Sequence, residues 1–354
     1  MIPIAVPYIS DAAIDEVEAI LRSGRLSAGP RVAAFETAWA SRVGCRWGIA
    51  TTNGTTALVA ALYSVGVRPG DRVLTSPFTF IASVNSILAL GAEPVFCDVD
   101  LDSGNMQADL VAELVETVNP KAVLAVHLYG NPMQLRALRA LCRAQGVKLV
   151  EDCAQAHGAV TDAGPAGSVG DAAAFSFYAT KNLAVGEGGM VTTHHAEIAE
   201  RCALFVNHGS STRYHHVAFG LNFRMMEIQG AIGLHALAAL EEGNRQRALN
   251  ARYLLDAVGT RVPVVNTPDS VFHQFTLRID QREHLADWLT RRGVGHGIYY
   301  PAIVPDQPVF ARRFRGDYPH ARALAHEVLS VPIHPRLSES EREQVARALR
   351  TFLG

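Results

Sequence analysis

Residues 121–152 read KAVLAVHLYGNPMQLRALRALCRAQGVKLVED and contain two apolar runs of strand length with a helix-length segment between them. Both runs are rich in aliphatic and β-branched residues, which are typical of strands buried on both faces. The segment that begins at Pro132 is long enough to form the helix that a connection between parallel strands requires. This stretch therefore predicts a strand–helix–strand unit with two parallel strands.

The same alternation extends in both directions along the chain. Before residue 121, strands at 47–52, 71–76 and 94–99 alternate with helices that start at Asn53 and lie near 79–90 and 107–118. After residue 152, the runs AAAFSFYATK (172–181) and GGMVTT (188–193) add two strands, followed by a helix to about residue 207. This order predicts an α/β fold with a mostly parallel central sheet covered by helices on both faces. In such sheets ligands bind at the carboxyl ends of the strands.

Further helices and a smaller unit flank the sheet region. Ser10 is placed to cap a packing helix that ends at Gly24, and Pro30 opens a second packing helix. Beyond the sheet we expect a helix near 224–241, a second helix from Asn244, and then a smaller α/β unit whose last helix is capped by Ser338. The prediction is a large domain, residues 1–245, and a small C-terminal domain, residues 246–354.

Composition excludes several classes of protein. The 354 residues are 49% apolar, and their formal charge of −2 offers no basic surface for nucleic acid. The sequence has neither a signal peptide nor an apolar run of membrane-spanning length, so we expect a cytoplasmic protein that binds no membrane. The five cysteines include no CxxC pair, so neither a disulfide framework nor a zinc site is indicated, and we expect no metal.

Lysine is rare in this chain, and one lysine stands in an unusual place. Of 32 basic residues, only Lys121, Lys148 and Lys181 are lysine. Lys181 lies in FSFYATKNLAVGEGG (175–189), between an apolar strand and a glycine-rich turn. The simplest interpretation is a solvated surface lysine. A lysine desolvated at a strand end would instead have a lowered pKa and a neutral amine that attacks carbonyl groups, which indicates Schiff-base chemistry.

The segment TTNGTTAL (51–58) combines a strand end, a turn and a helix start. Asn53 is placed to cap the helix, and Gly54, Thr55 and Thr56 offer free backbone N–H groups to an anion. The segment is neither a P-loop nor a GxGxxG turn, so it fits a single phosphate better than the pyrophosphate of a nicotinamide dinucleotide. Simple helix capping explains the segment equally well.

The stretch LVEDCAQAHG (149–158) ends a buried strand in two carboxylates. Glu151 and Asp152 point to opposite faces of the sheet, because side chains alternate along a strand. The carboxylate that faces the cleft has three candidate partners: a metal ion, a helix N-terminus or a cationic heteroaromatic nitrogen. Gln155 and His157 are placed to line the same pocket. Phe78 follows another strand end, where its ring either stacks on a planar ligand or belongs to the core.

One cofactor uses all of these features together. Pyridoxal 5′-phosphate has a phosphate for a helix start, a planar ring for an aromatic side chain, a ring nitrogen for a carboxylate and an aldehyde for Lys181. The carboxylate keeps the ring nitrogen protonated, and the lysine moves protons during the reaction. The sequence therefore predicts a pyridoxal-phosphate enzyme.

Motifs along nearly the whole chain resemble those of the DegT/DnrJ/StrS sugar aminotransferases, which have the aspartate aminotransferase fold, called fold type I. These motifs are NGTTAL, SPFTFIAS, AVHLYGNP, EDCAQAHGA, GSVGDAAAFSFYATKNLAVGEGGMV, NHG, LNFRMMEIQGAIGL and VPIHPRLSESE. Their occurrence together, in the order usual for the family, makes the resemblance specific.

The resemblance assigns roles around the cofactor ring. It implies that Lys181 is the Schiff-base lysine, that Asp152 is the partner of the pyridinium nitrogen and that Gln155 contacts the ring hydroxyl. Phe78 resembles the aromatic residue that stacks on the ring.

The resemblance also assigns the phosphate ligands. Gly54, Thr55 and Ser176 resemble those supplied by the same subunit, and Asn222 resembles the residue that reaches the phosphate from the other subunit of a homodimer. The alternative for Asn222 is a cap on a helix that begins near Arg224.

The resemblance implies an aminotransferase that moves an amino group from an amino acid, most often L-glutamate, to a nucleotide-linked keto sugar. We expect that sugar to be a 4-keto-6-deoxyhexose. The alternatives are a keto-cyclitol aminotransferase and a non-catalytic regulator with the same fold. YHHVAFG (214–220) and GIYYPAIVPDQP (297–308) resemble substrate-contacting segments, although PAIVPDQP departs from the family's proline–histidine pattern.

Overall fold

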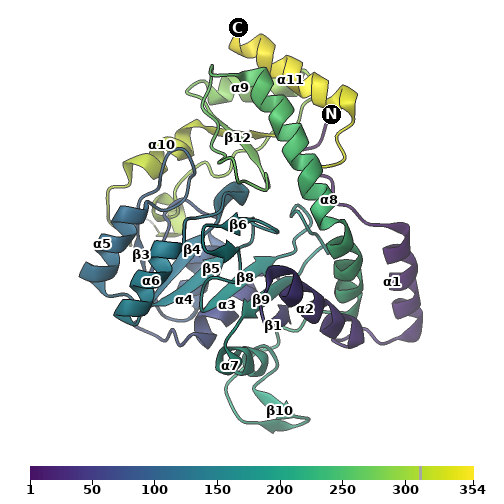
Figure 1. Cartoon of the computed structure of the whole chain (residues 1–354), viewed down its shortest axis with the longest axis vertical. Helices are drawn as coiled ribbons and strands as arrows, with labels where there is room; N and C mark the ends of the chain where they lie inside the picture. The colour runs from purple at the N-terminus through teal and green to yellow at the C-terminus, as the bar shows by residue number, and fades with distance from the viewer. Residues whose placement is uncertain (311–312) are drawn as a thin grey trace.

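The computed structural model describes residues 1–310 and 313–354, and its main feature is one large sheet (Figure 1). The sheet has the strand order β1-β9-β8-β5-β4-β2-β3. Its strands are β1 (Trp47–Thr51), β2 (Arg72–Thr75), β3 (Glu93–Phe96), β4 (Ala122–Val126), β5 (Lys148–Asp152), β8 (Ala172–Ser176) and β9 (Gly189–Thr193). Within this sheet β9 runs against the other strands, because it pairs antiparallel with both β1 and β8. The prediction of a mostly parallel α/β sheet is confirmed.

Helices cover both faces of the sheet, and the side chains of each strand alternate between these two apolar faces. Val150 of β5 belongs to a core that includes α3 (Gly54–Ser64), α4 (Ala82–Ala89) and α7 (Ala196–Val206). Its neighbour Leu149 belongs to a core with α5 (Ala108–Val118) and α6 (Arg136–Gln145). Phe175 of β8 packs with α2 (Pro30–Val43) and α8 (Glu227–Val258). The carboxyl ends of the strands therefore lie between two layers of helices.

The two N-terminal helices pack to different degrees. α1 (Asp11–Ser23) is capped by the Ser10 side chain and ends at Gly24, and α2 begins at Pro30, as predicted. Phe35 and Trp39 of α2 are fully buried. The apolar face of α1 is only partly covered, because Ile14 and Leu21 are 54% and 55% exposed.

A smaller unit at the C-terminal end has its own apolar core. Its centre is an antiparallel pair, β12 (Phe275–Arg278) and β13 (Val328–Val331), against which α9 (Arg282–Arg291) and α11 (Glu339–Leu353) pack. Ser338 and Glu341 form the predicted capping box of α11. The remaining elements are α10 (Pro319–Glu327), η1 (Leu128–Gly130), η2 (Val304–Asp306), η3 (Pro308–Phe310), β6 (Val160–Thr161), β7 (Gly164–Pro165), β10 (Ser210–Thr212) and β11 (His215–His216).

One long helix links the sheet to the smaller unit. α8 is continuous over 32 residues, so the predicted break between residue 241 and Asn244 is wrong. Glycine at 243 lowers the helix propensity, but buried contacts on both sides, at Leu240 and Arg247, hold the helix together. Figure 1 shows α8 running from the sheet toward α11. The predicted domain boundary near residue 245 lies within this helix, and the division into two domains stays a prediction.

The segment after α7 projects from the body of the molecule in Figure 1 and contains the short β10–β11 hairpin. Tyr214 at its turn is 83% exposed. In the part of the chain that the structure describes, none of the helices combines the length and the apolar character that a membrane crossing needs.

Two glycines of α8 provide a matched test of the helix packing. A Cβ at Gly230 would lie 2.6 Å from the backbone nitrogen of Val32 in α2, whereas a Cβ at Gly243 would meet only Pro335 Cγ at 3.9 Å. We expect Gly230→Ala to lower the free energy of unfolding by about 1–3 kcal/mol, because α2 and α8 must separate. Gly243→Ala should raise it by roughly 0.5–1 kcal/mol through helix propensity. Chemical unfolding of both variants measures the difference, and equal effects would contradict the close helix contact.

Candidate active site

A pocket of about 460 Å³ opens at the carboxyl ends of the strands. The last residues of β4, β5 and β8, which are Val126, Asp152 and Ser176, all line it. Six of the predicted site residues lie in its wall: Gly54, Thr55, Asp152, Gln155, Ser176 and Lys181. Phe78 and Asn222 are not part of the wall, and His157 lies buried behind it.

Asp152 is the carboxylate that faces the pocket. Its Oδ2 accepts a hydrogen bond from Ser83 Oγ at 2.7 Å, and its Oδ1 accepts one from the backbone N–H of Ala154 at 3.1 Å. Burial raises the pKa of Asp152, and the hydrogen bonds and the nearby charge of Lys181 offset that effect only in part. A cation bound beside Asp152 would therefore stabilise its charged form.

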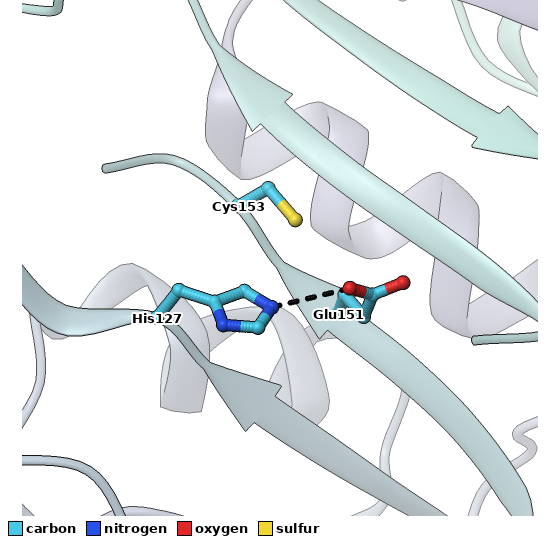
Figure 2. A group of neighbouring side chains, drawn as sticks. All are labelled: His127, Glu151 and Cys153. Carbon is cyan, nitrogen blue, oxygen red and sulfur yellow. Dashed lines mark hydrogen bonds and ion pairs between the residues drawn. The ribbon is translucent and has the colours of Figure 1, made fainter. Parts of the chain in front are cut away.

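Glu151 precedes Asp152 on the strand and points to the opposite face, and Figure 2 shows its carboxylate beside the His127 ring. Its two oxygens accept hydrogen bonds from the backbone N–H groups of Gly167, Val169 and Gly170 at 2.8–2.9 Å. His127 Nε2 donates a fourth hydrogen bond at 3.2 Å. Burial by itself raises the pKa of Glu151, but these hydrogen bonds and the His127 ring together hold the pKa below its ordinary value. The predicted alternation of the two carboxylates is confirmed.

His127, Glu151 and Cys153 also have the spacing of a possible metal site, because their ligand atoms lie within 4.8 Å of one another. The hydrogen bonds argue for another role. His127 Nδ1 accepts a hydrogen bond from the backbone N–H of Met133, so the ring proton is on Nε2. The Nε2–H group donates a hydrogen bond to Glu151. Both ring nitrogens and both carboxylate oxygens are therefore engaged, and the cluster is a hydrogen-bonded part of the core.

The start of α3 is built to approach an anion. Asn53 and Thr56 form a capping box, with Asn53 Oδ1 accepting from Thr56 N–H at 3.0 Å. The Thr56 N–H, which was expected to be free, is therefore occupied by the cap. Among the described residues, no hydrogen bond occupies the N–H groups of Gly54 and Thr55. A Cβ at Gly54 would lie 2.6 Å from Ser176 Cβ, so only glycine allows the helix to come this close to the end of β8. Two free N–H groups and the Ser176 hydroxyl therefore face the pocket together.

Lys181 lines the same pocket as Gly54, Ser176 and Asp152. Burial lowers the pKa of its ammonium group to about 8, and the negative charge of Asp152 opposes that change. Its Nζ atom has no hydrogen-bond partner within residues 1–310 and 313–354. A substantial fraction of the amine is therefore neutral near physiological pH and available to a carbonyl group.

The aromatic part of the wall differs from the expectation. Phe78 is fully buried and packs edge-on against Tyr129 and Tyr300, so it belongs to the core alternative. Phe80, two residues later, lines the pocket and is 55% exposed. The structure therefore replaces Phe78 by Phe80 as the aromatic residue available to a planar ligand. The stacking role of Phe78 came from the resemblance, and the turn that follows the end of β2 at Thr75 decides which of the two rings reaches the pocket.

Gln155 lines the pocket with both ends of its amide engaged. Its Oε1 accepts from the backbone N–H of Tyr129 at 2.6 Å, and its Nε2 donates to Tyr300 Oη at 3.1 Å. A ligand that contacts Gln155 must therefore share it with Tyr300. Tyr300 lies in the segment 297–308 that was expected to contact substrate, and it lines the pocket.

Asn222 lies outside the pocket and is exposed. Its Oδ1 accepts from the backbone N–H of Arg224 at 3.4 Å, but α8 begins only at Glu227, after Met226 as its N-cap. The alternative in which Asn222 caps this helix is therefore wrong. Among the described residues, no hydrogen bond links Asn222 to Thr55 or Ser176.

Sequence reasoning missed several polar side chains of the pocket, among them Ser83, His273 and Gln274. Ser83 lies in the SPFTFIAS motif, but nothing in that motif pairs it with Asp152, which is 69 residues away. His273 and Gln274 come from the C-terminal part of the chain, and only the packing of that part against the sheet brings them to the pocket.

Comparison with protein families matches residues 7–350 to the DegT/DnrJ/EryC1/StrS aminotransferase family. Among curated relatives, the dTDP-3-amino-3,4,6-trideoxy-alpha-D-glucose transaminase of Streptomyces venezuelae is 38% identical, covering 97% of this chain and 92% of the relative. A "pleiotropic regulatory protein" of Geobacillus stearothermophilus is 37% identical, covering 95% of this chain and 93% of the relative. The crystal structure of S. venezuelae DesV in complex with a ketimine intermediate matches with a TM-score of 0.91 and 35% identity, covering 99% of each chain.

The fold and the site thus define an aminotransferase with a mostly parallel sheet and a lysine in the turn that follows β8. The chain belongs to the DegT/DnrJ/EryC1/StrS aminotransferase family. The predictions of this family, of its fold type I architecture and of an aminotransferase are confirmed.

The buried Glu151 predicts a specific sensitivity to acid. Its folded-state pKa lies below the ordinary 4.5, so its ionised form stabilises the fold above pH 4.5, and this contribution is lost as pH falls through the lower folded value. Glu151→Gln should cost about 3 kcal/mol, because an amide has one oxygen for four donors, and should weaken the pH dependence below 4.5. Chemical unfolding at several acidic pH values measures both effects. The exposed Glu283→Gln is the control, and identical acid profiles would contradict the assignment.

The environment of Lys181 predicts its chemical reactivity. In protein freed of bound small molecules, modification of Lys181 by acetic anhydride should be half-maximal at about pH 8, because the neutral amine accumulates as pH rises through that value. Peptide mass spectrometry resolves the three lysines, and Lys181→Ala identifies the peptide concerned. Labelling that begins only in strongly alkaline solution would show that the amine is charged at neutral pH.

Proposed function

We propose that this protein is a pyridoxal-phosphate-dependent aminotransferase that transfers an amino group from an amino acid, most simply L-glutamate, to a nucleotide-linked keto sugar. The observation that carries the proposal is the position of Lys181. Its weakly basic amine lies in one pocket with a buried carboxylate and with the free N–H groups of a helix start.

The residues of the pocket fit this cofactor. Gly54, Thr55 and Ser176 form a cradle for a phosphate, and the close approach at Gly54 leaves no room for a side chain there. Burial raises the pKa of Asp152, so this carboxylate favours a cationic partner such as a protonated ring nitrogen. Phe80 offers an aromatic face in the same wall, and Gln155 and Tyr300 offer polar groups.

When bound, pyridoxal phosphate supplies an aldehyde that accepts an amino group and a ring that stabilises negative charge. Lys181 would hold that aldehyde through Nζ and, once released, carry a proton between the substrate carbon and its own amine. Asp152 would keep the ring nitrogen protonated, and Ser83 fixes the Asp152 carboxylate by donating a hydrogen bond at 2.7 Å. Gly54, Thr55 and Ser176 would bind the phosphate.

The class of acceptor is supported by the relatives. The S. venezuelae transaminase is named for a dTDP-linked 3-amino sugar, which favours a nucleotide-linked sugar over a free cyclitol for this chain. The expected acceptor is a 4-keto-6-deoxyhexose, and that same name makes a 3-keto sugar the second candidate. The alternative to an enzyme is a non-catalytic regulator with the same fold. The Geobacillus relative bears a regulatory name, but the pocket of this chain contains Lys181, Asp152 and Ser176 together.

A substrate panel tests the proposed function. Purified protein is incubated with pyridoxal phosphate, L-glutamate and separate UDP- and dTDP-linked 3-keto and 4-keto sugars, with a keto-cyclitol as a further acceptor. Mass spectrometry should detect an amino sugar and 2-oxoglutarate in equal amounts for one nucleotide-linked class. Turnover of the cyclitol alone would favour the first alternative. Cofactor binding without any turnover would favour a regulator.

We further propose a homodimer in which Asn222 completes the phosphate site of the partner subunit. Asn222 is exposed and lies outside its own pocket, which leaves it free to act elsewhere. Exposed apolar side chains at the pocket mouth and near Asn222 suit burial against a second copy: Phe80, Tyr178, Phe219, Leu221 and Met226. A two-fold axis would place two such sites in one interface.

The roles of Lys181 and Asp152 make different predictions. Lys181→Ala should abolish turnover and leave the fold intact, because it removes the amine and no large apolar contact. Asp152→Asn should still bind the cofactor but lose at least about a hundredfold in rate, because an amide does not hold a charged ring nitrogen. Turnover and visible absorbance are measured side by side. Normal rates in either variant would contradict its assigned role.

Sharing of the site predicts complementation. Lys181→Ala and Asn222→Ala subunits, co-expressed with different affinity tags and purified as mixed dimers, should regain part of the wild-type rate, because one of the two sites then has both intact residues. If Asn222 acts in its own subunit, each site keeps one defect and no activity returns. Asn222→Ala homodimers must first show weakened cofactor retention, and a fully active monomer in light scattering would defeat the prediction.

A further inference from the structure

His273 occupies a pocket wall that no predicted motif covers. Its side chain lines the pocket, although the residue as a whole is only 5% exposed. The preceding residue, Phe272, has a φ of +46°, an uncommon conformation for a residue other than glycine. The backbone is held there from two sides, because Ser270 Oγ accepts from Phe272 N–H at 3.1 Å and Arg247 donates to Phe272 C=O at 3.1 Å. The position of His273 is thus firmly set by its neighbours.

A chain of hydrogen bonds with a fixed direction ends on the His273 ring. It starts at the backbone carbonyl of His157, which can only accept, so the Asn244 group 2.7 Å away is its Nδ2. Asn244 Oδ1 then accepts from Asn182 Nδ2 at 2.9 Å. The second proton of Asn182 Nδ2 goes to the carbonyl of Val271 at 3.1 Å. Both donors of Asn182 are therefore used, and its Oδ1 is left as an acceptor.

The ring nitrogen that faces Asn182 must consequently carry a proton. His273 Nδ1 lies 3.1 Å from Asn182 Oδ1, and an amide oxygen accepts but does not donate. Burial and the positive charges of Lys181 and Arg247, with the ring of His157 close by, hold the pKa of His273 well below its ordinary value, so the ring is neutral. A neutral ring with a proton on Nδ1 has a bare lone pair on Nε2. Nε2 has no hydrogen-bond partner among residues 1–310 and 313–354.

We propose that His273 is a substrate-binding residue whose Nε2 accepts a hydrogen bond from an N–H or O–H group of a substrate in this pocket. The proposal rests on the proposed aminotransferase function. Two substrates carry such a group: the amino-acid donor through its amine, and the keto sugar through a hydroxyl beside the ketone. A ketone oxygen or a carboxylate does not fit, because neither can donate to Nε2.

Asn182 is the positioning residue in this arrangement. It directly follows Lys181 in the chain, and its side chain reaches α8 through Asn244 and the segment 271–273 through Val271 and His273. It therefore connects the turn that carries the reactive lysine to the C-terminal wall of the pocket. Without Asn182 Oδ1, the series of hydrogen bonds would no longer hold the proton on Nδ1 of His273.

The ring tautomer is tested first, without any turnover. Holoenzyme labelled with ¹⁵N-histidine is studied by long-range ¹H–¹⁵N correlation at neutral pH, and His273→Gln assigns the signal. The expected pattern is a protonated Nδ1 and a bare Nε2, and Asn182→Ala should shift the ring toward the Nε2-protonated form. A charged ring, or a proton on Nε2 in the unchanged protein, would overturn the proposal.

The contact with substrate is tested in the two half-reactions separately, each followed by the cofactor absorbance. His273→Leu should raise the half-saturating concentration of one substrate about tenfold, because it removes one hydrogen bond. The maximal rate constant of that half-reaction should change little. His273→Gln, whose Oε1 can take the place of Nε2, should restore most of the affinity. An effect on the L-glutamate half-reaction identifies the amine as donor, and an effect on the sugar half-reaction identifies the hydroxyl. The buried His334→Gln, outside the pocket, is the control.

Unchanged half-saturating concentrations in both half-reactions, or a loss of the maximal rate constant alone, would overturn the role of His273 as a substrate contact. Failure of the unmodified enzyme to catalyse either half-reaction is a different result, because it contradicts the proposed function and leaves the tautomer measurement standing.

Discussion

The arrangement of the pocket depends on how one buried carboxylate, Glu151, is satisfied. A charged group with no access to water is tolerated only when its hydrogen-bonding capacity is filled, and here four donors fill it. Three of the donors belong to the turn before β8, and the fourth is His127 at the end of β4. Glu151 thereby ties the carboxyl ends of β4 and β5 to the turn that leads into β8, and the next residue, Asp152, is presented to the pocket on the other face.

Once these strand ends are fixed, burial determines the chemistry of the groups that they carry. The same desolvation that raises the pKa of Asp152 lowers the pKa of Lys181 to about 8, because it disfavours the charged form of each group. The attraction between the two charges opposes both changes and only partly cancels them. A pocket of this kind favours a ligand that brings its own cation to Asp152 and a carbonyl group to Lys181, as pyridoxal phosphate would.

The part of the pocket wall that contains His273 is held in place by hydrogen bonds between neutral amide groups. The hydrogen bonds of Asn244 and Asn182, which begin at the carbonyl of His157, determine which amide atom faces the ring of His273. That atom is an acceptor, the Oδ1 of Asn182. Arg247 of α8 holds the backbone of the same segment. A continuous α8 is therefore more than a link between two parts of the chain, because its middle residues support the segment that closes the pocket.

The sequence by itself determined the sheet, the family and most of the site. The apolar runs between helices predicted the parallel strands, and side-chain alternation separated Glu151 from Asp152. The position of Lys181 after an apolar strand indicated a lowered pKa as one of two interpretations, the other being a solvated lysine. These inferences succeeded because they depend on local periodicity and on motifs within a few residues. Tertiary structure alone decided the continuity of α8, the replacement of Phe78 by Phe80, and the placement of Ser83 and His273. Each of these depends on packing between segments far apart in the chain: Ser83 donates to a residue 69 positions away, and His273 reaches Asn182 across 91 positions. A local sequence pattern carries no information about such contacts, because burial and hydrogen-bond partners are determined only when the distant segments pack together.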